Sequence, residues 1–160
     1  MSSAILTMTD LAAHAATWRA SGRTIVLTNG CFDLLHAGHL QTFTAAKQLG
    51  DILVVGLNSD RSVSSLKGPT RPLINQDQRA LLVAALKPVD FVTIFDQQDA
   101  CLLLETVQPH IYVKGGDYTL DNLPEKETIA RLDTNVVFIP LVPGVSTTEL
   151  VRKIQTANWS

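Results

Sequence analysis

Short runs of β-branched and aliphatic residues alternate along this chain with segments that have the spacing of an amphipathic helix. The predicted strands are residues 24–28, 51–57, 91–95, 110–113 and 136–139, and the predicted helices are residues 38–49, 75–86, 100–107, 124–132 and 147–155. Strands that are almost continuously apolar are expected to be covered on both faces, and alternation with helices implies parallel pairing through right-handed crossovers. The pattern therefore predicts an α/β fold with a doubly wound, five-stranded parallel sheet.

The length and charge of the chain limit what such a fold binds. A chain of 160 residues suits a single domain, 1–160, with a short helix at about 9–20 before a core at about 23–155. Its 13 basic and 15 acidic residues argue against a nucleic-acid partner. The apolar runs are too short to span a membrane, and no signal peptide is visible. Since Cys31 and Cys101 lie far apart, we expect a reduced, cytoplasmic protein.

The common nucleotide and hydrolase motifs of α/β folds are missing from this sequence. The glycines form neither Gly-x-Gly-x-x-Gly nor Gly-x4-Gly-Lys-Ser/Thr, which argues against a dinucleotide oxidoreductase and against a P-loop NTPase. Gly-x-Ser-x-Gly is also absent, which argues against a serine hydrolase of this architecture. Ligands of such sheets bind at the carboxyl ends of the strands, so a binding site is expected in the loops that follow the strands.

The loop after the first predicted strand carries two histidines at the start of a helix. His36 and His39 flank Gly38, which allows an anion to approach the backbone. A helix N-terminus attracts phosphate, and imidazole donors there can stabilise charge that develops on a triphosphate. Two alternatives remain open: one core and one surface histidine, or a metal site formed with Asp33. Lys47, further along this helix, either faces the same pocket or lies on the helix surface.

Two other strand-end segments contain groups that suit phosphate. Lys114 follows the fourth predicted strand and precedes two glycines, so it either reaches a phosphate or belongs to an ordinary turn. Ser146 and Glu149 form a capping box for the last helix, whose hydroxyl-rich start is also an anion site.

A polar loop at about residues 58–74 joins the second predicted strand to the next helix. Four of the 13 basic residues fall between positions 61 and 79 of a slightly acidic chain, and these are Arg61, Lys67, Arg71 and Arg79. They form either a solvated loop or a cationic lid over a phosphate.

These motifs together resemble a known family. The segment from Gly30 to His39 is similar to the His-x-Gly-His motif of the cytidylyltransferase-like nucleotidyltransferases, and 146–148 resembles their Ser-Thr-Thr motif. One branch, the D-glycero-β-D-manno-heptose 1-phosphate adenylyltransferases, is similar in further segments: 57–60, 67–68, 71–72, 75, 78–79 and 113–118. The likeness covers about residues 23–155 and implies a Rossmann-like nucleotidyltransferase fold.

The resemblance implies transfer of AMP from ATP to a sugar 1-phosphate, with Mg²⁺ accompanying ATP and the protein acting as a homodimer. The catalytic residues it implies are His36, His39 and Lys114. The nucleotide-binding residues are Asn29, Gly30, Cys31, Phe32, Asp33, Gly38, Lys47, Gly115, Asp117, Ser146, Thr147 and Thr148. The acceptor-binding residues are Asp60, Lys67, Arg71, Arg79 and Tyr118. Asp33 and Asp117 orient these groups or hold Mg²⁺ through water, and no direct metal ligand is assigned.

One departure from the family pattern bears on the nucleotide. The glycerol-3-phosphate cytidylyltransferase branch has an arginine where this chain has Leu141, which argues against CTP and removes one phosphate ligand. A transferase for glycerol 3-phosphate, phosphoethanolamine or FMN remains an alternative, as does a nucleotide-binding regulatory module without turnover. The presence of His36, His39 and Lys114 favours an enzyme over that module.

Overall fold

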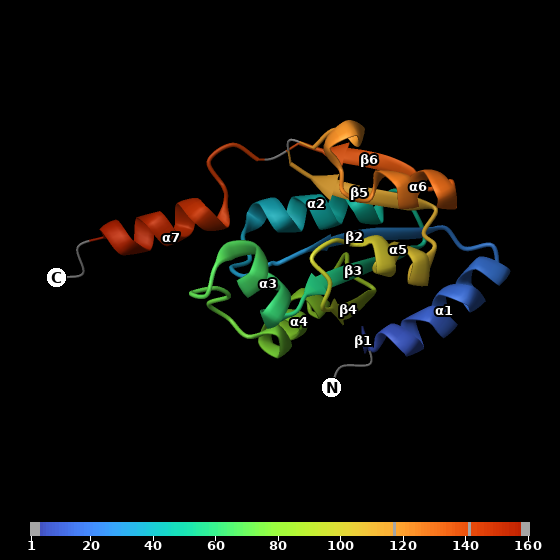
Figure 1. Ribbon diagram of the computed structural model, residues 1–160, viewed down its shortest axis with the longest axis horizontal. Coiled ribbons are helices and arrows are strands. Elements are labelled where there is room, and N and C mark those ends of the chain that lie inside the picture. The colour runs from blue at the N-terminus through green and yellow to red at the C-terminus, as the bar shows by residue number, and fades with distance from the viewer. Residues whose placement is uncertain (1–3, 117, 141, 158–160) are drawn as a thin grey trace.

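The computed structural model describes residues 4–116, 118–140 and 142–157. Its described strands form one parallel sheet of six strands in the order β1-β4-β3-β2-β5-β6 (Figure 1). These strands are β1 (Ile5–Leu6), β2 (Ile25–Gly30), β3 (Ile52–Asn58), β4 (Phe91–Phe95), β5 (Ile111–Gly115) and β6 (Asn135–Ile139). The predicted doubly wound α/β sheet is confirmed, but the predicted number of five strands is wrong.

The additional strand, β1, is only two residues long and lies at the edge of the sheet beside β4. Ile5 and Leu6 pair with Val92 and Thr93, and the Val92 N–H also donates to the Ala4 carbonyl at 2.8 Å. Two residues are too few to give a periodic pattern. Pairing with β4 creates this strand, which is why the sequence did not predict it.

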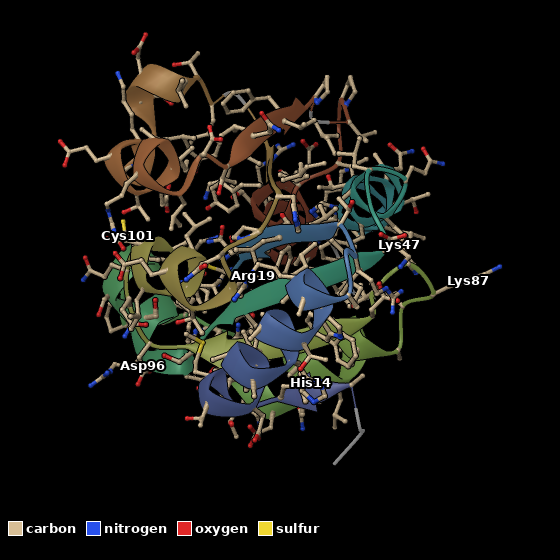
Figure 2. The ribbon with its side chains drawn as sticks, turned by 90° about the vertical axis from the view of Figure 1, so that its right-hand side faces the viewer. His14, Arg19, Lys47, Lys87, Asp96 and Cys101 are labelled. Carbon is tan, nitrogen blue, oxygen red and sulfur yellow. The ribbon has the colours of Figure 1, made fainter. Side chains whose placement is uncertain are left out.

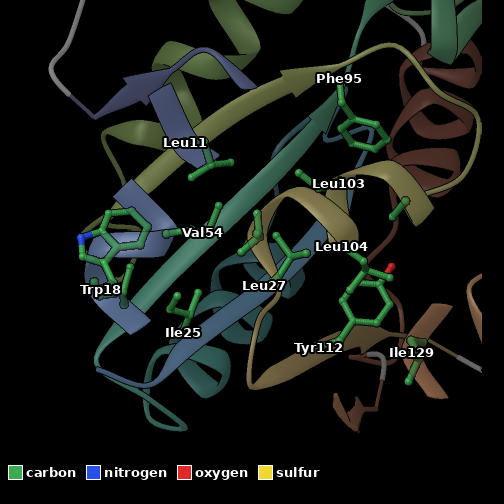
Figure 3. Packing of buried hydrophobic residues seen from close by; sticks show 14 of the residues in the cluster. Leu11, Trp18, Ile25, Leu27, Val54, Phe95, Leu103, Leu104, Tyr112 and Ile129 are labelled. Carbon is green, nitrogen blue, oxygen red and sulfur yellow. The ribbon is translucent and has the colours of Figure 1, made fainter. Parts of the chain in front are cut away.

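Helices cover both faces of the sheet. They are α1 (Met8–Ala20), α2 (Ala37–Lys47), α3 (Asp60–Lys67), α4 (Gln76–Ala84), α5 (Cys101–Val107), α6 (Lys126–Leu132) and α7 (Thr147–Thr156), with a 3₁₀ turn η1 (Leu120–Asn122). On one face, side chains of α1, α5 and α6 pack on the sheet, including Leu11, Leu104 and Ile129 (Figure 3). On the other face, Phe43 of α2 and Val83 of α4 pack on the alternate strand residues. No helix among the described residues is long and apolar enough to cross a membrane.

The segment predicted as a loop at 58–74 contains helix α3, so two helices rather than one lie between β3 and β4. The Ser59 hydroxyl caps α3 by accepting from the Ser62 N–H at 3.1 Å, and only Ser62 and Val63 of the helix are buried. A polar helix with one buried apolar residue lacks the periodicity that predicts a helix. The expected cap of α4 is confirmed, because Asn75 Oδ1 accepts from the Gln78 N–H at 3.0 Å.

The strand order reverses between β2 and β5. From β2 the chain builds β3 and β4 on one side, then returns to place β5 and β6 on the other. Loops that follow neighbouring strands at such a reversal diverge, and the opening between them is where ligands of open α/β sheets bind. Helix α7 begins near this point and projects from the body in Figure 1, with none of its described residues buried.

Candidate active site

A cavity of about 310 Å³ lies at this reversal point. It is lined by the turn after β2, the starts of α2 and α7, and the ends of α3 and β5: Thr28, Asn29, Gly30, Cys31, Phe32, Asp33, His36, Gly38, His39, Thr42, Lys67, Gly115, Val142, Val145, Ser146, Thr147 and Thr148. The fold therefore brings together the predicted nucleotide-binding residues with the exception of Lys47. Asp117, also predicted, and Leu141 lie outside the described residues.

The two histidines of the cavity stack on each other. Their ring centroids are 3.7 Å apart with an interplanar angle of 20°. The His36 backbone N–H donates to His39 Nδ1 at 3.4 Å, so the proton of a neutral His39 ring is on Nε2. A Cβ on Gly38 would lie 3.0 Å from His36 Nδ1, so glycine lets the His36 ring fold over the helix start. The spacing of the motif thus produces one compact pair of imidazoles.

Both imidazoles are neutral at neutral pH. Burial, together with the smaller effects of nearby His36 and Lys67, lowers the pKa of His39 to about 4. Burial also lowers the pKa of His36. Neutral rings act through their N–H groups as hydrogen-bond donors rather than as positive charges. Four buried side-chain atoms of the described residues have no hydrogen-bond partner: His36 Nδ1, Arg71 Nη2, Thr93 Oγ1 and Glu125 Oε2. Of these four residues, His36 is the one that lines the cavity.

Phe32 packs against one ring of the histidine pair, that of His39. Its ring meets His39 edge-on at 5.2 Å and Phe43 at 5.1 Å. Its φ of 46° turns the chain sharply between β2 and α2, and a Cβ on Gly30 would lie 2.9 Å from the Phe32 ring. Phe32 therefore shapes the turn and packs against His39.

The start of α7 lines the same cavity as the histidines. Ser146 Oγ accepts from the Glu149 N–H at 3.1 Å, which confirms the predicted cap. The Thr147 hydroxyl donates to the Leu34 carbonyl at 3.2 Å and so ties α7 to the turn after β2. Thr148 also lines the cavity. This arrangement places two helix N-termini, those of α2 and α7, at one cavity, and both favour anions.

Lys114 lies on the face of the sheet opposite to α2. Side chains alternate along β5, so Lys114 shares the face of Tyr112, whereas Val113 packs in the core on the α2 side. Lys114 Nζ lies 3.3 Å from Asn29 Oδ1, and over the rings of Tyr112 at 5.4 Å and Tyr118 at 5.2 Å. Burial lowers the pKa of Lys114. Asn29 both lines the cavity and contacts Lys114, and it therefore joins the two faces at the sheet edge.

Arg79 and Asp60, predicted to bind the acceptor, bind each other. Arg79 is 1% exposed, and its guanidinium donates to Asp60 Oδ1 at 2.6 Å. It also donates to the carbonyls of Cys31 at 2.6 Å, Asn58 at 2.9 Å and Ile74 at 2.8 Å. These contacts hold the end of β3 and the turn after β2 against α4. They leave Arg79 engaged within the protein rather than at the cavity.

Arg71 and Asp33 form a second internal pair. Arg71 Nε donates to Asp33 Oδ2 at 2.6 Å, and Asp33 Oδ1 accepts the N–H groups of Leu73 at 2.8 Å and Ile74 at 3.1 Å. Although burial opposes ionisation, these hydrogen bonds, led by that of Ile74, lower the pKa of Asp33. The Asp33 side chain is 0% exposed and accepts three hydrogen bonds within the protein, so it is engaged in the fold rather than open to direct coordination of Mg²⁺. The described residues contain no group of three or more His, Cys, Asp or Glu arranged to hold a metal.

The two remaining predicted lysines have different surroundings. Lys47 donates to Asp90 and to the Asp51 carbonyl at the far end of α2. Figure 2 labels Lys47. That view shows the right-hand side of Figure 1, which is the side remote from α7. The prediction that Lys47 lies in the nucleotide pocket is therefore wrong. Lys67, at the end of α3, lines the cavity and forms no ion pair with the described residues.

The sequence did not predict four residues that line the cavity. They are Thr28, Thr42, Val142 and Val145. The Thr42 hydroxyl donates to the Gly38 carbonyl at 3.1 Å, and its position one turn after His39 is the signal that helical spacing offered. No local pattern marks the two valines, because the path of the chain between β6 and α7 brings them to the cavity.

Comparisons with known proteins agree with this geometry. The profile of the cytidylyltransferase-like family matches residues 27–153, and the chain belongs to that family. It is 49% identical over 139 residues to the bifunctional protein HldE of Trichlorobacter lovleyi, which covers 87% of this chain and 28% of that protein. It is 49% identical over 149 residues to the bifunctional protein HldE of Rhodopseudomonas palustris, which covers 93% of this chain and 30% of that protein.

The chain thus spans about 30% of the length of these relatives. A solved structure, of the lipopolysaccharide core biosynthesis protein from Thermoplasma volcanium GSS1, is similar with a TM-score of 0.63 and 30% identity. The likeness covers 76% of this chain and 98% of that one. The resemblance found in the sequence motifs is therefore confirmed at the level of the family.

Proposed function

We propose that this chain transfers AMP from ATP to D-glycero-β-D-manno-heptose 1-phosphate, forming ADP-heptose and pyrophosphate. The observation that carries the proposal is the gathering of His36, His39 and the Ser146–Thr148 helix start around one cavity at the reversal point of the sheet. The resemblance of residues 113–118 to the heptose branch, and the relatives named above, support the choice of substrate.

The chemistry follows from the groups in the cavity. An oxygen of the sugar phosphate attacks the α-phosphorus of ATP, the bond from that phosphorus to the β-phosphate bridging oxygen breaks, and pyrophosphate leaves with the electron pair. The attacking phosphate is already ionised at neutral pH, so no general base is needed. Neutral His36 and His39 donate N–H groups toward the phosphates, and pre-organised donors of this kind lower the barrier without reorganisation.

In this proposal Mg²⁺ enters with ATP as part of the substrate. The described cavity offers one carboxylate, that of Asp33, and its oxygens are already bound to Arg71, Leu73 and Ile74. Mg²⁺ keeps several waters and is commonly held by substrate phosphates, which agrees with a cavity of neutral and cationic donors.

The acceptor lies on the side of Lys114 and Tyr118 in this proposal. The Lys114 ammonium neutralises the attacking phosphate, and Asn29 connects it to the cavity. Tyr118, which is 44% exposed, offers a hydroxyl to the sugar. We further propose a homodimer acting in the cytoplasm, as the family resemblance implies, and sedimentation of the purified protein tests the dimer.

Pyrophosphate release tests the proposal with four substrate pairs, ATP or CTP with heptose 1-phosphate or glycerol 3-phosphate. We expect ATP with heptose 1-phosphate to be fastest, with kcat/KM at least about tenfold above CTP. Faster turnover of CTP with glycerol 3-phosphate would contradict the heptose assignment and leave the nucleotidyltransferase chemistry. Nucleotide binding without pyrophosphate release from any pair would favour the regulatory module instead.

A further inference from the structure

A buried tyrosine outside the predicted site contacts the residue that joins Lys114 to the cavity. Tyr112 is 0% exposed and packs near Leu104 and Ile129 (Figure 3). Its hydroxyl lies 2.6 Å from Asn29 Oδ1, the same oxygen that lies 3.3 Å from Lys114 Nζ. The Asn29 side chain therefore meets two partners through a single atom.

The chemistry of these partners fixes the orientation of the Asn29 amide. A lysine ammonium only donates hydrogen bonds, so the atom facing Lys114 is the amide oxygen and not the nitrogen. Burial raises the pKa of the Tyr112 phenol far above its usual value, so Tyr112 stays neutral and donates to that oxygen. The amide NH₂ of Asn29 is then turned away from both partners.

The same contacts restrict Lys114. Its ammonium lies over the Tyr112 ring and over the Tyr118 ring, with Asn29 Oδ1 as its hydrogen-bond acceptor. A lysine side chain is flexible and loses much rotamer freedom when it is held in one place. The Tyr112 hydroxyl holds the acceptor on which this placement depends.

We propose that Tyr112 is a positioning residue for nucleotidyl transfer: its hydroxyl locks the Asn29 amide so that Oδ1 holds Lys114 and the NH₂ group is presented to the phosphates in the cavity. This inference rests on the proposed function for its substrates. It assigns no contact between Tyr112 and the substrate. The role is exerted through Asn29, which lines the cavity.

A double-mutant cycle with Tyr112→Phe and Asn29→Ala tests this coupling. Tyr112→Phe removes only the hydroxyl and should lower kcat/KM about tenfold, the scale of one lost hydrogen bond to a positioned group. In the Asn29→Ala background the same substitution should have no further effect, because its target is gone. Thr134→Val is the matched control: it deletes another buried hydroxyl, which donates to the Pro109 carbonyl, and should leave kcat/KM unchanged. Additive effects of the two substitutions would overturn the proposal.

A second readout separates failure of this inference from failure of the proposed function. The side-chain NH₂ resonances of Asn29, assigned by their loss in Asn29→Ala, report the amide directly and need no substrate. We expect Tyr112→Phe to shift them clearly and Thr134→Val to leave them in place. Unshifted resonances in Tyr112→Phe would overturn the proposal that Tyr112 orients the Asn29 amide. Shifted resonances in a protein that releases no pyrophosphate would support that orientation and contradict the proposed function.

Discussion

The start of α2 and the segment from Ser59 to Arg79 both carry polar side chains toward the carboxyl edge of the sheet, but they differ in what those side chains bind. At the start of α2, His36 Nδ1 is left without a partner in the described chain, and Gly38 leaves the backbone open. In the second segment, Arg79 binds the Asp60 carboxylate, and Arg71 Nε binds the carboxylate of Asp33 in the turn after β2, although Arg71 Nη2 has no partner among the described residues. Groups that the protein leaves unsatisfied at a cavity are available to a ligand, whereas satisfied groups stabilise the fold.

The largest expected effect on activity, which tests whether the start of α2 contacts the substrate, is at the histidines. His36→Ala and His39→Ala should each lower kcat by about 10²–10³-fold, because each removes one pre-organised donor. Thermal unfolding should change little by comparison. Steady-state pyrophosphate release measures the effect, and His14→Ala serves as the control, since His14 lies on α1 and stacks on Trp18 and Phe91 (Figure 2). Near-normal turnover in both folded variants would contradict the assigned role.

The next effect is expected on stability, at Arg79. Arg79→Met removes four hydrogen bonds and leaves the carbonyls of Cys31 and Asn58 without this donor, so the free energy of unfolding should fall by about 2–3 kcal/mol. Chemical denaturation measures it. Arg61→Met, which removes an exposed pair with Asp96, should change stability by less than about 0.5 kcal/mol. Wild-type stability of Arg79→Met, together with weaker binding of the sugar phosphate, would instead support the predicted role of Arg79 in binding the acceptor.

Lys67 is an exception to this contrast. It belongs to the segment from Ser59 to Arg79, but it lines the cavity and forms no ion pair with the described residues. Lys67→Ala should raise KM for ATP about three- to tenfold with a smaller change in kcat, and salt should reduce the difference from wild type. Initial rates at low and high ionic strength measure this. Arg61→Ala, a cation of the same helix away from the cavity, should leave KM unchanged. An equal effect of both variants would indicate general charge rather than a contact.

The smallest effect is expected at Cys31, which lines the cavity beside the histidines. Burial raises the pKa of its thiol, although Lys67 and Arg79 oppose this, so the thiol is not prepared as a nucleophile. Direct displacement needs no covalent intermediate, and Cys31→Ala should retain at least about a third of the wild-type kcat. Mass spectrometry of the enzyme mixed with ATP provides the stricter test. A nucleotidylated Cys31 would contradict direct displacement.

Much of the fold could be predicted because its causes are local. The apolar runs that became β2 to β6, the periodic helices, and the caps at Asn75 and Ser146 depend on residues within a few positions of each other. The histidine pair belongs to this class as well, since His36 and His39 meet within one helical turn. A sequence records such contacts as spacing, and spacing is what periodicity and capping rules interpret.

The partners of the charged side chains could not be predicted in the same way. Arg71 and Asp33 are 38 positions apart, and Arg79 meets the Cys31 carbonyl across 48. Asn29 meets Tyr112 across 83 positions and Lys114 across 85, because the strand reversal puts β2 beside β5. The sequence by itself determined which residues form strands, helices and the phosphate-facing turn, since short-range sterics and hydrogen bonding decide those. Only the tertiary structure decided which cations are neutralised inside the protein and which face the cavity, since charge pairing depends on distance in space.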